Sequence, residues 1–143
     1  MSTRKLVSGS VLALAGAFGV SAAALPAAAG VSQFQTRTLW ANPSDTVKVA
    51  TGDCGRNLCG WVVWASPDAE KDARDSGVAK LVGTEVLQDY HSVAPARWEG
   101  RVFVPDMGRT FVSTITQINP TALKISGCIW GGLICKSQIW HKV

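Results

Sequence analysis

The sequence predicts an all-β protein, an eight-stranded up-and-down β-barrel with one excursion of loop or short helix around residues 66–80. Three observations favour this fold. Short apolar runs followed by turn residues recur along most of the 143-residue chain. No long stretch after the N-terminal thirty residues follows the helical period. The runs also follow one another through short connections, which suits a meander closed into a barrel.

The expected strands each end where turn chemistry begins. They cover residues 36–41, 46–51, 58–65, 84–90, 100–105, 109–118, 122–128 and 135–143. Asn-Pro-Ser-Asp, Gly-Arg-Asn, Pro-Asp-Met-Gly, Asn-Pro and Gly-Gly separate them, and each has defined turn preferences. The charged segment 66–80 lacks the strand pattern, and Ser66 with Glu70 nearby is typical of a helix start. An eight-stranded barrel is wide enough to be filled by side chains or to hold one small ligand.

The first thirty residues have the three parts of a secretory signal peptide. Arg4 and Lys5 precede an uncharged run over residues 6–25, and Pro26 is followed by three alanines. We expect cleavage after Ala29, with Ala24 as a weaker site and an uncleaved membrane anchor as the competing interpretation. The predicted products are a signal peptide, 1–29, and one β-barrel domain, 30–143, that is periplasmic or secreted without a stable membrane anchor.

The charges of the expected mature chain are nearly balanced. Removing Arg4 and Lys5 from the 14 basic residues leaves 12, against 10 acidic residues. No block of basic residues with interleaved aromatic residues remains, so the sequence does not favour nucleic-acid binding.

Four cysteines remain after the expected cleavage, and an even number in a small exported domain favours two disulfides. We expect Cys54–Cys59 and Cys128–Cys135, because each pair flanks a turn between two strands. The crossed pairings, a redox site and a structural zinc site remain alternatives. The spacing disfavours the last two, since redox pairs have two intervening residues and zinc knuckles are tighter.

The strand at 58–65 is apolar on both faces, so both faces need a cover. Strict alternation places Leu58, Val62 and Trp64 on one face and Cys59, Trp61 and Val63 on the other. The charged segment 66–80 is one candidate cover. The other is a partner protein or a second copy of the chain, bound at a surface that includes Val62 and Trp64.

Three classes of function are compatible with these features. The first is binding of a small apolar or amphipathic ligand inside the barrel, for which the candidate residues are Trp61, Trp98, Phe103, Phe111 and Ile125. The alternative to ligand binding is that these side chains simply fill the core. The second is a structural or partner-binding module of the cell envelope, with a homodimer as one form.

An enzyme is the third class. His91, expected in a loop, His141, Asp89, Glu99, Asp106, Ser92 and Ser113 offer reactive groups. No nucleophile elbow, zinc-binding helix motif or phosphate loop organises them, so we expect no catalysis, no cofactor and no metal.

The order of several segments resembles a known family. "LCGWVVW", "KLVGTEVL", "WEGRVFVPDMGRTFVS", "LKISGC" and "CKSQIWHKV" follow one another as in the exported bacterial domain-of-unknown-function family 2147, from about Thr38 to Val143. The resemblance implies a lipocalin-like β-barrel in the periplasm, with no established enzymatic activity and a suspected role in binding a small ligand. The chain departs from that pattern at Thr38, at Phe103 and Val104, and at Lys142.

In an up-and-down barrel the first and last strands are neighbours. This arrangement predicts that Trp40 and Lys142 close the barrel together. We expect the ammonium group of Lys142 to lie over the Trp40 indole as a cation–π pair.

Overall fold

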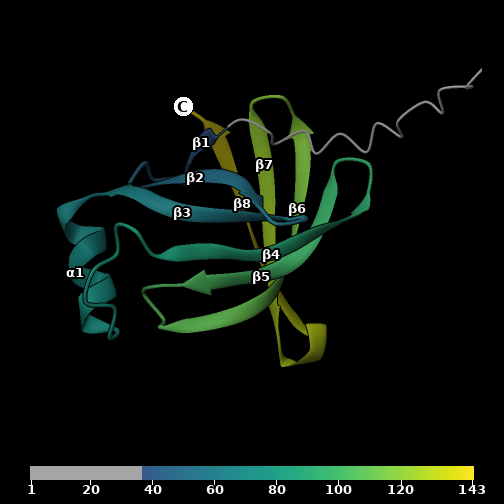
Figure 1. The fold of residues 1–143 in the computed structure, drawn as a ribbon. Helices are drawn as coiled ribbons and strands as arrows, with labels where there is room; N and C mark the ends of the chain where they lie inside the picture. Colours follow the sequence, from purple (N-terminus) through teal and green to yellow (C-terminus); the bar gives the residue numbers. More distant parts are fainter. Residues whose placement is uncertain (1–36) are drawn as a thin grey trace, which may run out of the picture. The chain divides into compact units, whose positions relative to one another are not determined.

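The computed structural model describes residues 37–143, which form a closed barrel of eight antiparallel strands and one helix (Figure 1). Each strand pairs with the next in sequence, and β1 pairs with β8. The elements are β1 Thr38–Ala41, β2 Val47–Cys54, β3 Asn57–Ala65, α1 Pro67–Asp75, β4 Glu85–Ala94, β5 Arg97–Val104, β6 Arg109–Asn119, β7 Ala122–Ile129, a 3₁₀ turn η1 Trp130–Gly132, and β8 Ile134–Lys142. The expected fold is confirmed. The expected signal peptide, 1–29, lies outside the described residues.

The barrel closes where the first and last strands were expected to meet. Trp40 pairs with Lys142 and Ala41 with His141, and the Val143 amide donates a hydrogen bond to the Leu39 carbonyl. The expected cation–π pair at this position was wrong. The Trp40 indole is buried, and its Nε1 donates to the Thr51 hydroxyl over 3.1 Å.

A β-bulge decides where the tryptophans of β3 point. Val62 pairs with Val49 but Trp64 pairs with Lys48, so Val63 is an extra residue opposite no partner. Val62 therefore faces the interior and is only 1% exposed, which corrects its assignment as a partner-surface residue. Trp64 faces outward and is 44% exposed. The Lys48 ammonium group lies over its ring, 5.1 Å from the ring centre, as a cation–π pair.

Trp61 also faces outward, because it neighbours the inward-facing Val62 in an uninterrupted part of the strand. Strict alternation had placed Trp61 and Trp64 on opposite faces. The bulge at Val63 reverses the second of them, and both indoles lie outside the barrel.

The segment after β3 forms a helix whose beginning follows from its sequence. The Ser66 side chain accepts a hydrogen bond from the Ala69 amide, and Pro67 occupies the first turn. The Glu70 carboxylate accepts hydrogen bonds from the amides of Leu81 and Val82, which fixes the loop that returns to β4. No helix in residues 37–143 is long and apolar enough to cross a membrane.

Helix α1 contributes its buried residue Ala73 to the apolar cluster of the domain. The register places Val86 and Phe103 next to each other on the outer face. Val86 belongs to the same cluster as Ala73, and Phe103 packs against that cluster. The Ser76 hydroxyl donates to the Asp106 carbonyl over 2.5 Å and ties the end of the helix to the β5–β6 turn. Phe103 is therefore on the outer face, and its expected place inside the barrel was wrong.

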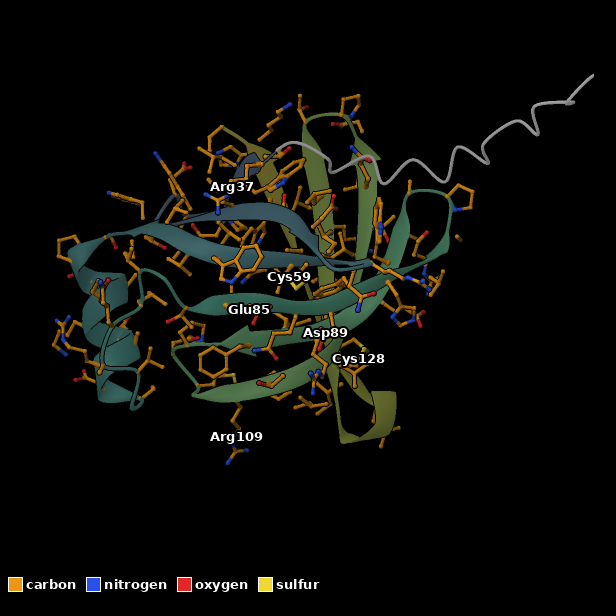
Figure 2. The ribbon with its side chains drawn as sticks, in the orientation of Figure 1. Arg37, Cys59, Glu85, Asp89, Arg109 and Cys128 are labelled. Carbon is orange, nitrogen blue, oxygen red and sulfur yellow. A yellow bond between two sulfur atoms is a disulfide. The ribbon has the colours of Figure 1, made fainter. Side chains whose placement is uncertain are left out.

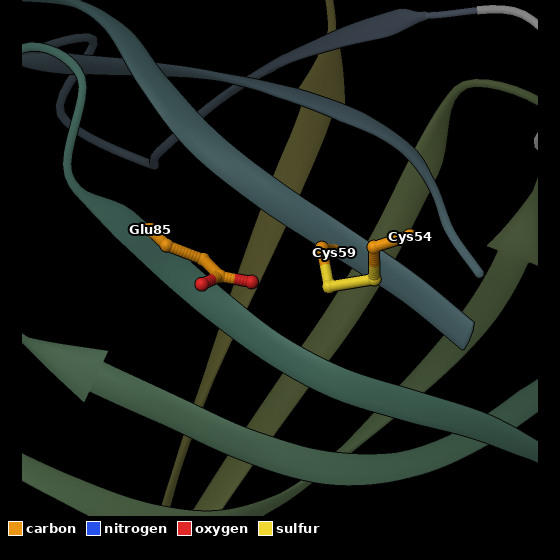
Figure 3. A group of neighbouring side chains, drawn as sticks. All are labelled: Cys54, Cys59 and Glu85. Atoms are coloured by element: carbon orange, nitrogen blue, oxygen red, sulfur yellow. A yellow bond between two sulfur atoms is a disulfide. The ribbon is translucent and has the colours of Figure 1, made fainter.

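Both expected disulfides are present. Cys54–Cys59 spans the β2–β3 hairpin, and Cys128–Cys135 joins residues directly opposite each other on β7 and β8. Figure 3 shows the Glu85 side chain beside the first disulfide, with donor atoms of the three residues within 4.8 Å of one another. Because the two sulfurs are bonded to each other, neither is the thiolate that a zinc ion would require.

Candidate ligand site at the open side of the barrel

A row of five residues crosses the inner face of the barrel from β4 to β8. Ser113 of β6 pairs with Gly100 on one side and with Gly127 on the other, and Gly127 pairs with Lys136. Tyr90 of β4 lies against Gly100. Directly paired residues project to the same face of a sheet. We call these five residues the inner row.

Tyr90 reaches the interior because of a second β-bulge. Gln88 pairs with Arg101 and His91 with Glu99, so Asp89 and Tyr90 together oppose the single residue Gly100. Asp89 takes a left-handed conformation (φ 52°), and its carboxylate forms an ion pair with Arg101 over 2.9 Å.

The absence of a side chain at Gly100 makes room for the tyrosine. A Cβ atom added there would lie 2.7 Å from the ring atom Cγ of Tyr90 and 2.7 Å from the Gln88 carbonyl. The aromatic ring therefore packs directly over the backbone of β5.

Two hydroxyl groups of the inner row lack hydrogen-bond partners. Tyr90 is fully buried and Ser113 is 2% exposed, yet neither hydroxyl has a partner within the described residues. Buried hydroxyls in proteins are nearly always paired, so such groups call for an explanation. Thr51 follows this rule, because it accepts from Trp40 and donates to the Thr38 carbonyl.

Tyr90 stays protonated over the whole physiological pH range. Burial raises the pKa of Tyr90 to about 12, which the Ser113 hydroxyl partly opposes. The two hydroxyls nevertheless do not reach hydrogen-bond geometry with each other. Tyr90 and Ser113 thus offer two neutral O–H donors in an apolar interior.

The barrel wall is incomplete beside the far end of the inner row. Strand β1 has only four residues and pairs with β8 only at Trp40 and Ala41. In the described part of the chain, residues 134–139 of β8 therefore pair with β7 alone. Lys136 and Gln138 face inward by their register but are exposed to solvent.

A hollow of about 350 Å³ opens where β6 and β7 separate. Pairing between these strands begins only at Val112 and Cys128, so Phe111 and Ile129 are spread apart. The lining residues are Met107, Arg109, Thr110, Phe111, Val112, Cys128 and Ile129. A Cβ atom placed on Gly127 would lie 4.0 Å from Phe111, so the hollow adjoins the inner row. Arg109 is one of these lining residues, and Figure 2 shows its side chain pointing away from the barrel.

The expected ligand-binding residues divide into three groups. Phe111 lines the hollow, as just described. Trp98 and Ile125 face inward but are buried in the packed core. Trp61 and Phe103 are on the outer face.

Nothing in the sequence pattern singles out Tyr90 or Lys136 as ligand-binding residues, and Ser113 is there only one hydroxyl among several. Alternation counted from Leu87 places Asp89 inside and Tyr90 outside, and the bulge reverses both. The one sequence signal of this bulge is Gly100, because a glycine inside a strand often marks a bulge in the paired strand.

A second hollow, of about 470 Å³, lies outside the barrel beside β3. It is lined by Arg37, Trp61, Val63, Val82 and Gly83, and it also borders Val62, whose side chain is buried in the core. Val63 is exposed next to it, as is Trp64. This surface, which we call the β3 outer patch, is apolar with a cationic rim.

The residues considered for catalysis are distributed over the barrel. His91 lies in β4, not in a loop, opposite Glu99, whose carboxylate is 3.4 Å from Arg97. The Nε2 atom of His141 is 2.9 Å from the Asp45 carboxylate at the β1–β8 end. These two histidines are on different strands, each beside a different carboxylate.

Comparison with known proteins places this barrel in a family. The family model described as "Uncharacterized protein conserved in bacteria (DUF2147)" matches residues 38–142. Among solved structures, protein HP1028 from Helicobacter pylori, described as belonging to the lipocalin family, matches with a TM-score of 0.59 and 13% identity. The match covers 77% of this chain and 84% of that chain, and at this identity it shows the fold alone. The comparison with curated proteins gave no match.

Proposed function

The chain belongs to the DUF2147 family of uncharacterized bacterial proteins and has a lipocalin-like barrel, and we propose that it binds a small amphipathic molecule at the inner row. The observation that carries this proposal is the pair of buried, unpartnered hydroxyls of Tyr90 and Ser113. An unsatisfied buried hydroxyl costs about 1–3 kcal/mol, and a ligand atom that accepts from both would recover much of that cost.

The surroundings of the hydroxyls support an acceptor head group with an apolar tail. Both hydroxyls can donate, and Lys136 adds a positive charge at the open end of the same row. The hollow beside Phe111 and Ile129 has both polar and apolar lining, and its volume of about 350 Å³ falls within the range of about 300–1,000 Å³ typical of ligand pockets. A carboxylate with an alkyl chain has the matching chemistry.

We propose that the barrel binds without chemical conversion and that the protein acts outside the cytoplasm. Two disulfides support an oxidising compartment, periplasmic or extracellular. If residues 1–29 are removed on export, the intact mass of the protein recovered from the cell envelope equals that of residues 30–143 with two disulfides. Recovery of the full-length mass from the cytoplasm would contradict the proposal of export.

Titration calorimetry with dodecanoate and dodecylamine tests ligand binding, because the two probes share a tail and differ in head group. We expect dodecanoate to bind and dodecylamine to bind far more weakly. Tyr90→Phe should weaken dodecanoate binding about tenfold, the equivalent of one lost hydrogen bond. Ser126→Ala is the matched control, since it removes a hydroxyl from the outer face of β7.

Native mass spectrometry of protein purified from its own envelope then identifies a resident molecule. A bare protein, together with equal dodecanoate affinities for the wild type and Tyr90→Phe, would exclude the inner row as the site.

The β3 outer patch supports a second candidate, a module that binds a protein partner. Its specific observation is the exposure of Trp64 beside the outer hollow, since large aromatic side chains are enriched at protein interfaces. Trp64→Ala should then abolish co-purification of the partner from the envelope, whereas Tyr90→Phe should not affect it. If the two variants retain the same partners as the wild type, the patch is not a binding surface.

A further inference from the structure

The open side of the barrel leaves an unpaired strand edge on β8. Residues 134–139 have β7 on one side, and within the described residues no strand pairs with them on the other. All six of these residues are exposed. An edge of this length presents a row of amides and carbonyls that another strand can bind.

The alternation of hydrogen bonds shows which residues present these groups. The Lys142 amide donates to the Thr121 carbonyl on the β7 side, and the Val143 amide donates to Leu39 on the β1 side. In an antiparallel strand, successive residues direct their backbone groups to opposite sides. The amides and carbonyls of Cys135, Ser137 and Ile139 therefore point to the open edge.

We propose that this edge binds β8 of a second copy of the chain, in an antiparallel pair centred on Ser137. In that register Ser137 pairs with its own counterpart, and Cys135 pairs with Ile139 of the other copy. The backbone groups of Cys135, Ser137 and Ile139, which point to the open edge in each chain, then form six main-chain hydrogen bonds between the two copies. A twofold axis gives both copies the same contacts, as in most homodimers.

Charge and length select this register over its neighbours. Lys136 is the one charged residue of the exposed stretch 134–139, and in the register centred on Ser137 it lies opposite the neutral Gln138. Centring the pair on Lys136 would put two ammonium groups opposite each other, which is unfavourable. Centring it on Gln138 would extend the partner strand to Trp140, where β1 begins to occupy the edge.

Exposed apolar side chains lie at both ends of the proposed interface. Leu133 is 83% exposed, and Ile134 and Ile139 are also exposed on either side of Ser137. In the dimer, Ile139 of one copy lies on the outer face beside the Cys128–Cys135 disulfide of the other. The pairing would also extend the incomplete wall next to Lys136 and bring the inner rows of the two barrels to one interface.

The test compares two substitutions at one position, followed by light scattering across micromolar to sub-millimolar concentrations. We expect the wild type to form a dimer. Ser137→Pro removes the amide at the twofold axis without removing a main-chain hydrogen bond to β7, and should raise the dissociation constant about tenfold or more. The hydroxyl bond between Ser126 and Ser137 is lost in Ser137→Pro and in Ser137→Ala alike. Ser137→Ala keeps the amide and should dimerise like the wild type. Circular dichroism checks that the proline variant keeps its fold.

A charge pair tests the register itself. Gln138→Lys places a lysine opposite Lys136 of the other copy and should weaken the dimer, and adding Lys136→Glu to it should restore the dimer. A wild type that remains monomeric throughout would overturn the proposal. A dimer that is indifferent to Ser137→Pro would show that another surface forms it.

Discussion

Gly100→Ala should destabilise the barrel far more than the matched substitution Gly127→Ala, although both glycines flank Ser113. An alanine Cβ at residue 100 would lie 2.7 Å from the Gln88 carbonyl and 2.8 Å from Tyr90 Cα, and both of these are backbone atoms that cannot move alone. At residue 127 the nearest atom would be Val102 Cγ1 at 3.6 Å, an ordinary contact.

The size of the effect follows from these distances. Overpacking costs about 1–3 kcal/mol, and two backbone clashes place Gly100→Ala at the upper end of that range. Replacing a strand glycine by alanine recovers about 0.5–1 kcal/mol of backbone entropy. We therefore expect a net loss of about 2 kcal/mol for Gly100→Ala and a change near zero, or a small gain, for Gly127→Ala.

Urea unfolding followed by tryptophan fluorescence measures both variants. For a domain of this size a loss of about 2 kcal/mol lowers the melting temperature by about 10 °C. If Gly100→Ala proved as stable as Gly127→Ala, the packing of Tyr90 over the β5 backbone would be refuted.

Two further predictions concern Tyr90 and the first disulfide. Tyr90 is the single tyrosine of the chain, so tyrosinate absorbance titrates this residue alone. The unfolded chain releases the phenol proton near pH 10 and the folded chain near 12, so folding stability should be constant below pH 10 and fall between pH 10 and 12. In Tyr90→Phe that component of the decline should vanish, and a wild-type phenol that titrates near pH 10 while folded would contradict its burial. Replacing Cys54 and Cys59 by serine should cost about 2 kcal/mol in urea unfolding, because the closed loop is short. A loss above about 4 kcal/mol would indicate that the bridge supports more than its own hairpin.

Regular alternation made the strands of this barrel predictable, and its interruptions limited what could be predicted of the site. The turn residues between β6 and β7 and between β7 and β8 locate those strands closely, and the cysteines flanking two turns identify both disulfides. An extra residue at Val63 and another at Asp89–Tyr90 reverse the faces that follow them. Strict alternation of faces cannot locate such a bulge, because the position of the extra residue depends on which neighbouring strand has space for it.

The exposure of β8 could not be predicted for a different reason. A strand's sequence specifies its own faces, while the completeness of the wall depends on the length of its neighbour. The turn after Ala41 ends β1 after four described residues, so the inner side of Lys136 remains accessible. The proposed ligand site therefore lies on the side that β1 leaves uncovered, while Trp98 is buried in the packed core.

The short β1 strand also makes the barrel seam its least durable part. In the described part of the chain, two residue pairs and the Val143–Leu39 hydrogen bond hold β1 against β8. They join positions about a hundred residues apart along the chain, whereas each hairpin joins near neighbours. Local opening of native proteins begins where few bonds hold an element. We expect the amides of Ala41, His141 and Val143, which face the seam, to exchange with deuterium well before those of β6. Because β1 stays paired with β2, the barrel would then behave as an eight-stranded sheet that opens and closes along the β1–β8 seam. Access to its interior would depend on the rate of that opening as well as on the shape of the barrel.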